Sequence, residues 1–259
     1  LFAKTWNEGG DVSQWFINGV PTIIADVDLT EVKEWTPIGT EERPWTGEFN
    51  GNNKKITGLT TPLFGNLRGV VKNVDITADI VHNGKSNAQF KGTDYGLGIL
   101  AHYLYADKNA NASVSGVTVR GSIKASGVSV SHNYFIGGFA GSSNGVSMTD
   151  CANYASISTE NINISGSNYC CVGGVLGRMQ SGSVTFTNCD NYGVIDVQSV
   201  TASSPCFGGV FGGADGAYTF TLADCDNMAV NSISGAPAVS VGNFIWPSNM
   251  HMGGVIALT

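Results

Sequence analysis

The sequence has little charge and very little positive charge. Its 259 residues include 13 Lys and Arg against 20 Asp and Glu, which gives a formal net charge of −7. The basic residues form no cluster, and neutralising phosphates with such clusters is the main source of nucleic-acid affinity. No apolar run approaches the roughly 20 residues that a membrane-spanning helix needs. These absences exclude nucleic acid and anionic membranes as expected partners.

The sequence also lacks the common catalytic and metal-binding motifs. It has no Gly-x-Ser-x-Gly, no phosphate-binding loop and no His-Glu-x-x-His, and its four His residues are widely spaced. Arg178 is the only Lys or Arg after Lys124, so a basic group to assist acid–base chemistry is scarce. We therefore predict a protein that is not an enzyme and that needs no cofactor or metal.

Glycine, in contrast, is abundant, with 35 residues, and it recurs in a period. A short apolar element that ends in Gly or Ala occurs six times, at steps of 36, 40, 36, 35 and 45 residues. Periods in this range indicate that one repeat is one supersecondary unit of a stacked array. The six copies are Leu63-Phe64-Gly65, Ile99-Leu100-Ala101, Phe139-Ala140-Gly141, Val175-Leu176-Gly177, Val210-Phe211-Gly212 and Val255-Ile256-Ala257.

A second element alternates with the first. Its best copies are Asn188-Cys189-Asp190-Asn191-Tyr192 and Asp150-Cys151-Ala152-Asn153-Tyr154, and Asn227 occupies the same position in a third. Stacking of the copies would align equivalent side chains into ladders. We expect one ladder of small apolar side chains in the core and one of Asn amides at a corner. The predicted apolar ladder is Val74, Val117, Cys151, Cys189 and Cys225.

These patterns predict an all-β fold. Apolar residues alternate in short stretches bounded by Gly, Ser and Asn, which is typical of strands. We predict a right-handed parallel β-helix with about three short strands per coil and six to seven coils. Residues 1–60 would form an N-terminal capping region and first coil, rich in Trp, and residues 61–259 a continuous series of repeats.

The cysteines fit the core better than a disulfide framework. Val replaces Cys in two of the five ladder positions, so the position requires a small apolar side chain. Stacked neighbours also have parallel Cβ directions, which suit a disulfide poorly. We predict buried thiols at Cys151, Cys189 and Cys225, and leave open whether Cys170, Cys171 or Cys206 forms a disulfide.

Two kinds of residue are candidates for function. Aromatic side chains in variable segments could bind a ligand, and we select Trp246 first, followed by Tyr103, Tyr105 and Tyr134. Tyr154 and Tyr192 recur in register, and we interpret them as structural. The carboxylates of Asp190 and Asp226 could instead serve a polysaccharide lyase or glycosidase, provided that a groove brings them close to Arg178.

The order of motifs resembles that of GLUG-motif proteins. The resemblance rests on Phe49-Asn50-Gly51-Asn52-x-Lys54-x-Ile56-Thr57-Gly58-Leu59, on Leu63-Phe64-Gly65, and on later copies such as Gly173-Gly174-Val175-Leu176-Gly177. It implies a right-handed parallel β-helix on the surface of a Gram-negative gut bacterium, with a lipid anchor and a role as an adhesin. GLUG repeats also accompany secreted immunoglobulin A peptidases, in which the repeats are not the catalytic part.

Together these observations predict a non-enzymatic cell-surface or extracellular β-helix whose loops bind a host or microbial glycan or protein. The alternatives are a carbohydrate-active β-helix enzyme and a structural spacer within a longer surface protein. Because the sequence begins at Leu1, we expect that a targeting or anchoring segment preceded it. The ligand and the oligomeric state are not indicated by the sequence.

Overall fold

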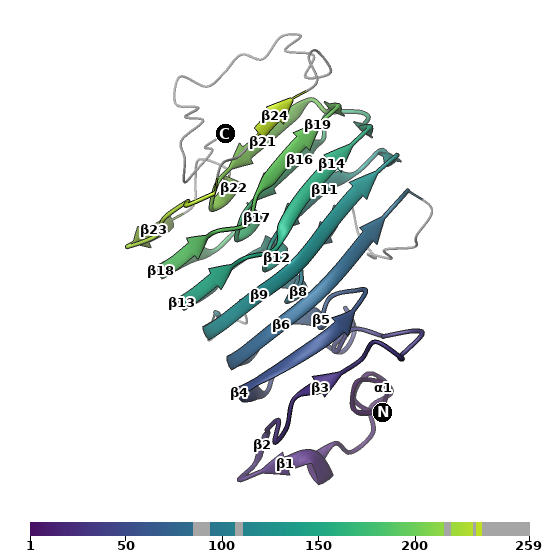
Figure 1. Cartoon of the computed structure of the whole chain (residues 1–259), viewed down its shortest axis with the longest axis vertical. Helices are drawn as coiled ribbons and strands as arrows, with labels where there is room; N and C mark the ends of the chain where they lie inside the picture. Colours follow the sequence, from purple (N-terminus) through teal and green to yellow (C-terminus); the bar gives the residue numbers. More distant parts are fainter. Residues whose placement is uncertain (85–93, 107–110, 215–218, 230–231, 235–259) are drawn as a thin grey trace.

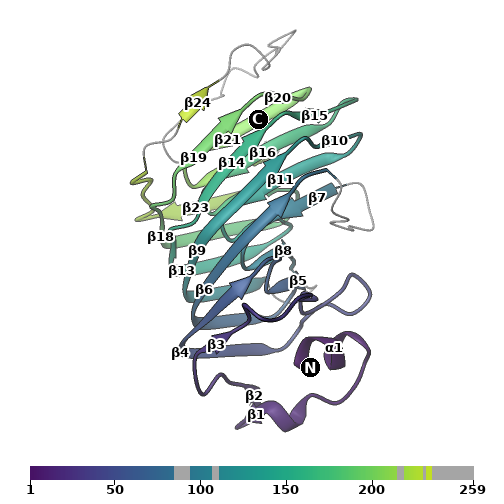
Figure 2. The same ribbon diagram turned by 45° about the vertical axis from the view of Figure 1, so that its right-hand side comes forward.

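The computed structural model describes residues 1–84, 94–106, 111–214, 219–229 and 232–234. The chain forms a parallel β-solenoid in which each coil pairs with the coils before and after it (Figures 1 and 2). This confirms the predicted fold class. The described part makes about four turns, fewer than the six to seven coils predicted for the whole chain. The sixth copy of the apolar element, Val255-Ile256-Ala257, lies outside the described residues.

The largest sheet has ten strands and forms one long face of the solenoid. Its strands alternate between buried and more exposed residues, as in β13, so that every second side chain enters the core. The strands are β3 (Val27–Asp28), β4 (Glu48–Leu59), β6 (Val70–His82), β9 (Ala112–Ser126), β13 (Val146–Asn153), β14 (Ser156–Glu160), β18 (Ser183–Asn191), β19 (Ile195–Gln198), β23 (Thr219–Ala223) and β24 (Ser232–Ser234).

Three smaller parallel sheets complete the coils. The five-stranded sheet contains β5 (Phe64–Leu67), β8 (Ala101–Leu104), β12 (Ala140–Ser143), β17 (Leu176–Met179) and β22 (Phe211–Ala214). The four-stranded sheet contains β7 (Asp94–Leu97), β11 (Asn133–Gly137), β16 (Tyr169–Gly173) and β21 (Ser204–Gly208). The short corner sheet contains β10 (Ser129–Val130), β15 (Ile162–Ile164) and β20 (Val200–Thr201).

The first five copies of the apolar-glycine element supply the strands of the five-stranded sheet. Phe64 and Ala140 both pair with Ala101, and Leu176 pairs with Phe211 in the last step. The glycines before these strands permit a close approach between coils: a Cβ added to Gly174 would lie 2.1 Å from the Gly209 carbonyl oxygen. The glycine period therefore reflects backbone packing at the corner between two sheets.

The second repeat element supplies the ladders. In the apolar ladder Val74 pairs with Val117 and Cys151 pairs with Cys189. All six cysteines are free; five are buried and Cys225 is half-buried. A ladder of isoleucines runs beside it through the ten-stranded sheet, with Ile80, Ile123, Ile157 and Ile195 in successive coils. Burial of these ladders at roughly 25 cal/mol per Å² stabilises the stack.

The N-terminal residues pack over the first coil. Helix α1 (Phe2–Asn7) is followed by the short helix η1 (Ser13–Trp15) and the antiparallel hairpin of β1 (Phe16–Ile17) and β2 (Val20–Pro21). The indole of Trp6 lies 4.5 Å from that of Trp45, which is only 1% exposed and faces the core. Figure 1 shows α1 beside the first strands. Phe2 and Trp6 of α1 are partly buried and pack against the apolar core.

Candidate functional site

An open cleft of about 600 Å³ lies between the N-terminal region and the first coils. One wall is the loop between β3 and β4, which carries Trp35 and Glu41, and the other wall comes from β8. The ends of β6 and β7 and residues 60–62 close the remaining sides. The cleft therefore combines segments that lie about 60 residues apart in the sequence.

Hydrogen bonds fix the loop that forms the first wall. At the end of α1, the Asn7 side chain donates to the Pro37 carbonyl oxygen at 2.9 Å and accepts from the Gly39 amide at 2.8 Å. Trp35 Nε1 donates to the Pro62 carbonyl oxygen at 3.1 Å. Gly39 has φ +86°, and a Cβ there would meet Asn66 at 2.6 Å, so this turn requires glycine. The wall is thus held before any ligand arrives.

Two of the predicted binding residues, Tyr103 and Tyr105, line the second wall. Their ring centroids are 5.6 Å apart, and the Tyr103 hydroxyl donates to the Asp94 carbonyl oxygen at 2.6 Å. Burial, and after it the nearby Glu41 carboxylate, raises the pKa of Tyr105, so its hydroxyl stays protonated at neutral pH. Burial also raises the pKa of Tyr103. Both phenols can donate and accept hydrogen bonds.

His102 is the third polar side chain of this wall. Its Nδ1 lies 2.7 Å from the Gly96 carbonyl oxygen, which can only accept, so Nδ1 carries the proton. Burial lowers the pKa of His102 to about 4, so the ring is neutral at pH 7. The residues that line the cleft include Glu41 and Glu42 but no Lys or Arg. The Arg68 guanidinium lies 5.1 Å from the Tyr105 ring centroid, outside this lining. The lining residues themselves therefore carry negative charge only.

The other predicted binding residues lie elsewhere. Tyr134 is completely buried in the core, and its hydroxyl lies 2.5 Å from His82 Nδ1. A side chain in this position does not reach a ligand at the surface, so we remove Tyr134 from the binding candidates. Its place in the run before a glycine pair, where neighbouring residues are apolar, could have indicated burial. Trp246 lies outside the described residues.

Arg178 lies buried, away from the acids with which a lyase would need to combine it. Arg178 is 2% exposed, and its Nη1 donates to Cys171 Sγ at 3.3 Å while its guanidinium lies 3.7 Å from the Tyr169 ring centroid. Asp190 belongs to β18 in the ten-stranded sheet, whereas Arg178 belongs to β17 in the five-stranded sheet. The structure thus does not bring Arg178 and the Asp190 carboxylate into one site.

Sequence reasoning missed one exposed aromatic feature. Recurrence in register predicts structural roles for Tyr154 and Tyr192, but these residues are 44% and 40% exposed. Their rings stack with centroids 4.6 Å apart and 6° between planes. The alternation of inward and outward side chains along a strand could have indicated this exposure. Each tyrosine directly follows a buried Asn, so each points outward. Recurrence in register indicated a ladder correctly, although the ladder lies on the surface.

Two negative findings complete the description. Among the described residues, no group of three His, Cys, Asp or Glu side chains is arranged to hold a metal ion. No helix in the described part of the chain has the length and apolar character needed to cross a bilayer.

Comparison with protein-family models and with curated proteins gave no match, so no family is shown for the chain. Two solved structures share its fold. One is named "putative immunoglobulin A1 protease" from Bacteroides ovatus, with TM-score 0.55 and 19% identity over 83% of this chain and 70% of the other. The second is named "IgA1 Protease", with TM-score 0.60 and 18% identity over 90% of this chain. This chain spans only 16% of the second protein's length.

The comparison corrects one sequence-based prediction. We predicted a protein that is not an enzyme, whereas both fold neighbours carry the names of proteases, which are enzymes. The prediction was wrong because it took the absence of short catalytic motifs as sufficient evidence against an enzyme. Catalytic residues can lie far apart in the sequence. At 18–19% identity the likeness concerns the fold alone, so it does not assign protease activity to this chain.

Proposed function

We propose that this chain is a ligand-binding β-solenoid of a secreted or cell-surface protein, and that its cleft binds a glycan that is neutral or carries an amino group. The observation that carries the proposal is the cleft of about 600 Å³, in which Trp35, Tyr103 and Tyr105 lie together with Glu41 and Glu42. A pocket of this size with aromatic walls and a few convergent polar groups is typical of small-ligand sites. Adhesion to a host or microbial surface would follow from such binding.

The chemistry of the cleft favours a sugar. Aromatic rings can pack against the apolar C–H faces of a pyranose, while carboxylates and amides such as Glu41 and Asn66 can bond its hydroxyl groups. The negative charge of the lining disfavours uronic and sialic acids, because like charges repel in a partly desolvated site. The fold neighbours named as immunoglobulin A1 proteases agree with a location outside the cell.

Glycan binding can be tested on the full 259-residue chain. An array of neutral, amino and acidic glycans identifies a ligand, and calorimetry then measures its dissociation constant. We expect Tyr105→Ala to raise the Kd roughly two- to tenfold, since a ring contact contributes about 0.5–1.5 kcal/mol. The matched control is Tyr192→Ser, an exposed tyrosine in the connection between β18 and β19. An affinity unchanged by Tyr105→Ala, or binding to acidic glycans alone, would refute the proposal.

A further inference from the structure

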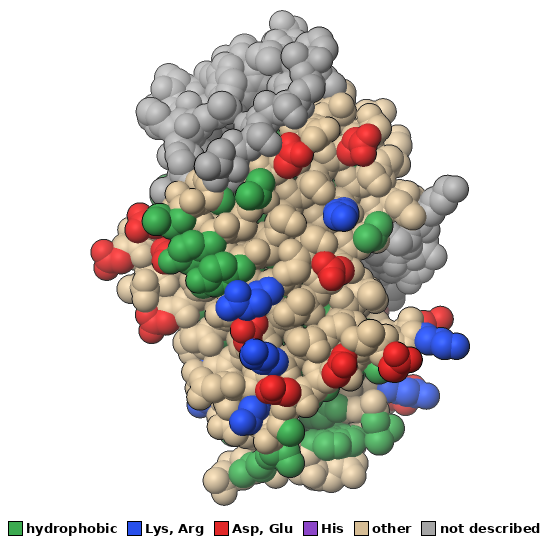
Figure 3. Space-filling model, in the orientation of Figure 1, with side chains coloured by type: hydrophobic (Ala, Val, Ile, Leu, Met, Phe, Trp, Pro, Cys, Tyr) green, Lys and Arg blue, Asp and Glu red, His purple; other side chains and the backbone are tan. Residues whose placement is uncertain are grey.

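An exposed apolar strip runs across the outer face of the ten-stranded sheet, separate from the cleft. We define the tyrosine strip as Tyr154, Tyr192, Val194 and Met228, whose side chains are 44%, 40%, 47% and 64% exposed. Figure 3 shows hydrophobic side chains gathered on this face beside Lys, Arg, Asp and Glu side chains. Contiguous exposed apolar surface of this kind marks an interaction site in soluble proteins.

Backbone hydrogen bonds place the strip in one column with Arg120. The amide of Tyr154 donates to the Val119 carbonyl, that of Tyr192 to the Asn153 carbonyl, and that of Met228 to the Asn191 carbonyl. Each of these carbonyls belongs to the residue that directly precedes, in sequence, the column member of the coil before. Arg120, Tyr154, Tyr192 and Met228 thus occupy equivalent positions in four successive coils.

A neighbouring column of the same face carries carboxylates. Asp75 pairs with Thr118, Thr118 with Ala152, and Ala152 with Asp190. Asp190 Oδ1 accepts the Asp226 amide at 3.0 Å in the next coil, so Asp226 continues this column. The acidic column therefore begins beside Arg120 and ends beside Tyr192 and Met228.

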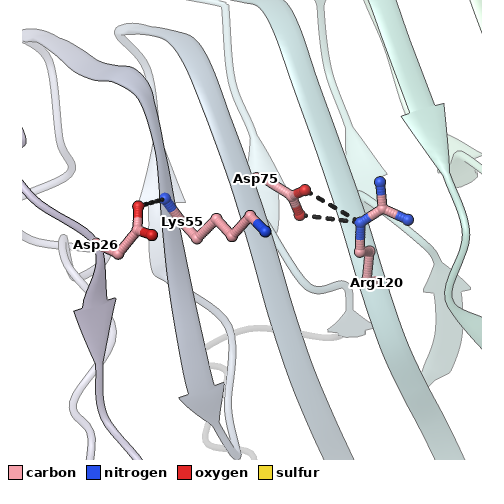
Figure 4. Close-up of polar contacts among 4 residues, drawn as sticks. All are labelled: Asp26, Lys55, Asp75 and Arg120. Carbon is pink, nitrogen blue, oxygen red and sulfur yellow. Dashed lines mark hydrogen bonds and ion pairs between the residues drawn. The ribbon is translucent and has the colours of Figure 1, made fainter.

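At the lower end of the strip, the protein itself shows how this face holds a cation. Arg120 Nε lies 3.1 Å from Asp75 Oδ2 (Figure 4). The guanidinium carbon of Arg120 lies 4.5 Å from the Tyr154 ring centroid. The guanidinium is therefore placed between a carboxylate of the preceding coil and a tyrosine of the following coil. Both contacts are favourable, the first by charge and the second by cation–π attraction.

The diagonal placement of the carboxylate recurs three coils further along, with Met228 in place of the arginine and with Tyr192 in the same coil as Asp190. Met228 lies one coil after Asp190 and in the neighbouring column. Arg120 lies in the same relation to Asp75. The Asp190 carboxylate accepts the Tyr192 hydroxyl at 3.1 Å, and neither Asp190 nor Asp226 forms an ion pair with a described Lys or Arg. After Lys124 the chain has only Arg178, which is buried on another sheet.

We propose that the tyrosine strip is a docking surface for a basic protein segment, one whose Arg or Lys side chains lie against Tyr192 and pair with Asp190 and Asp226 while its apolar side chains cover Val194 and Met228. Charge complementarity selects this occupant. A second copy whose corresponding coils met across the strip would bring like charges together at Asp190 and Asp226. Tyrosine, methionine and arginine are also the residues that protein interfaces favour.

The probe for this surface is a fluorescein-labelled octapeptide of alternating Arg and Leu, compared with an analogue in which citrulline replaces Arg. Fluorescence anisotropy with the full chain measures both affinities at low and at physiological salt. We expect Tyr192→Ser and Asp226→Asn each to weaken binding of the Arg peptide roughly two- to fivefold, as loss of an exposed cation–π or ionic contact does. The double variant should lose roughly tenfold.

The controls separate the strip from general acidity. Glu31→Gln removes the same charge at an exposed position in the N-terminal region, and Tyr105→Ala alters the cleft; both should leave the affinity unchanged. Equal binding of the citrulline analogue would overturn the proposal, and so would an equal loss in Glu31→Gln. Self-association in analytical ultracentrifugation that Tyr192→Ser abolishes would also overturn it, because a second copy would then cover the strip. Circular dichroism checks that each variant folds.

Discussion

The side chain of Asn153 donates from Nδ2 to Oδ1 of Asn191 in the next coil at 2.7 Å. Both amides are completely buried. Asn191 donates in turn to Asn227 Oδ1 at 2.8 Å and to the Gly193 carbonyl oxygen at 3.0 Å. Each amide therefore forms hydrogen bonds with the backbone of its own corner and with the amide of the following coil. A hydrophobic side chain at this position could form neither.

We expect Asn191→Ala to lower the free energy of unfolding by roughly 2–4 kcal/mol, because buried partners on both sides lose their hydrogen bonds. Chemical denaturation measures the change. The control is Asn163→Ala, an exposed asparagine of β15, which should change the stability by less than about 0.5 kcal/mol. Equal effects of the two substitutions would contradict the role given to the amide ladder.

Gly174→Ala should destabilise the stack by roughly 2–3 kcal/mol or more, as overpacking does. The added Cβ would lie 2.1 Å from the Gly209 carbonyl oxygen and 2.3 Å from Cγ of Asn191, and backbone cannot move away as a flexible side chain can. Gly213→Ala meets only Cys side chains, the nearest atom at 3.0 Å, and should be milder. Thermal unfolding of both variants tests this order.

The five buried cysteines should react with a thiol reagent only after unfolding. All six are free and five are buried. The hydrogen bond with Cys151 raises the pKa of Cys189 to about 12, and burial raises the pKa of Cys170, which suppresses the reactive thiolate. At pH 8 without reductant, we expect at most one fast-reacting thiol, removed by Cys225→Ser, and six after denaturation. Fewer than six after denaturation would reveal a disulfide.

The stability should fall as the pH is lowered from about 6.5 to about 4. Burial lowers the pKa of His102 from 6.5 to about 4, so between these values the unfolded chain binds a proton that the folded protein excludes. The contribution of the neutral His102 ring to the free energy of unfolding is fully present above pH 6.5. It is lost progressively as the pH falls toward 4. Denaturation at pH 7 and pH 5 measures the slope. His102→Gln should flatten it, and an unchanged slope would contradict this assignment.

The fold could be predicted because its determinants repeat. Gly174 and Asn191 belong to the two recurring elements, and their periods reveal a stack before any contact is known. The cleft could not be predicted in the same way. Trp35 and Tyr103 meet across it because the N-terminal region folds back over the first coils, and no local pattern encodes that meeting. Tyr103 and Tyr105 become binding candidates only because they are aromatic residues in variable segments. The same criterion also includes Tyr134, which is buried.

The contact between Gly174 and Asn191 sets limits on how this chain can change in length. Insertion or deletion of one residue within β18, which ends at Asn191, would move the Asn191 amide away from its neighbours in both adjoining coils. Each later outward side chain of that strand would then turn inward. Connections away from these two positions, such as residues 165–168 between β15 and β16, carry no such constraint. Evolution and protein engineering can therefore exchange corner loops or add whole coils, whereas the strands can only be copied as complete units.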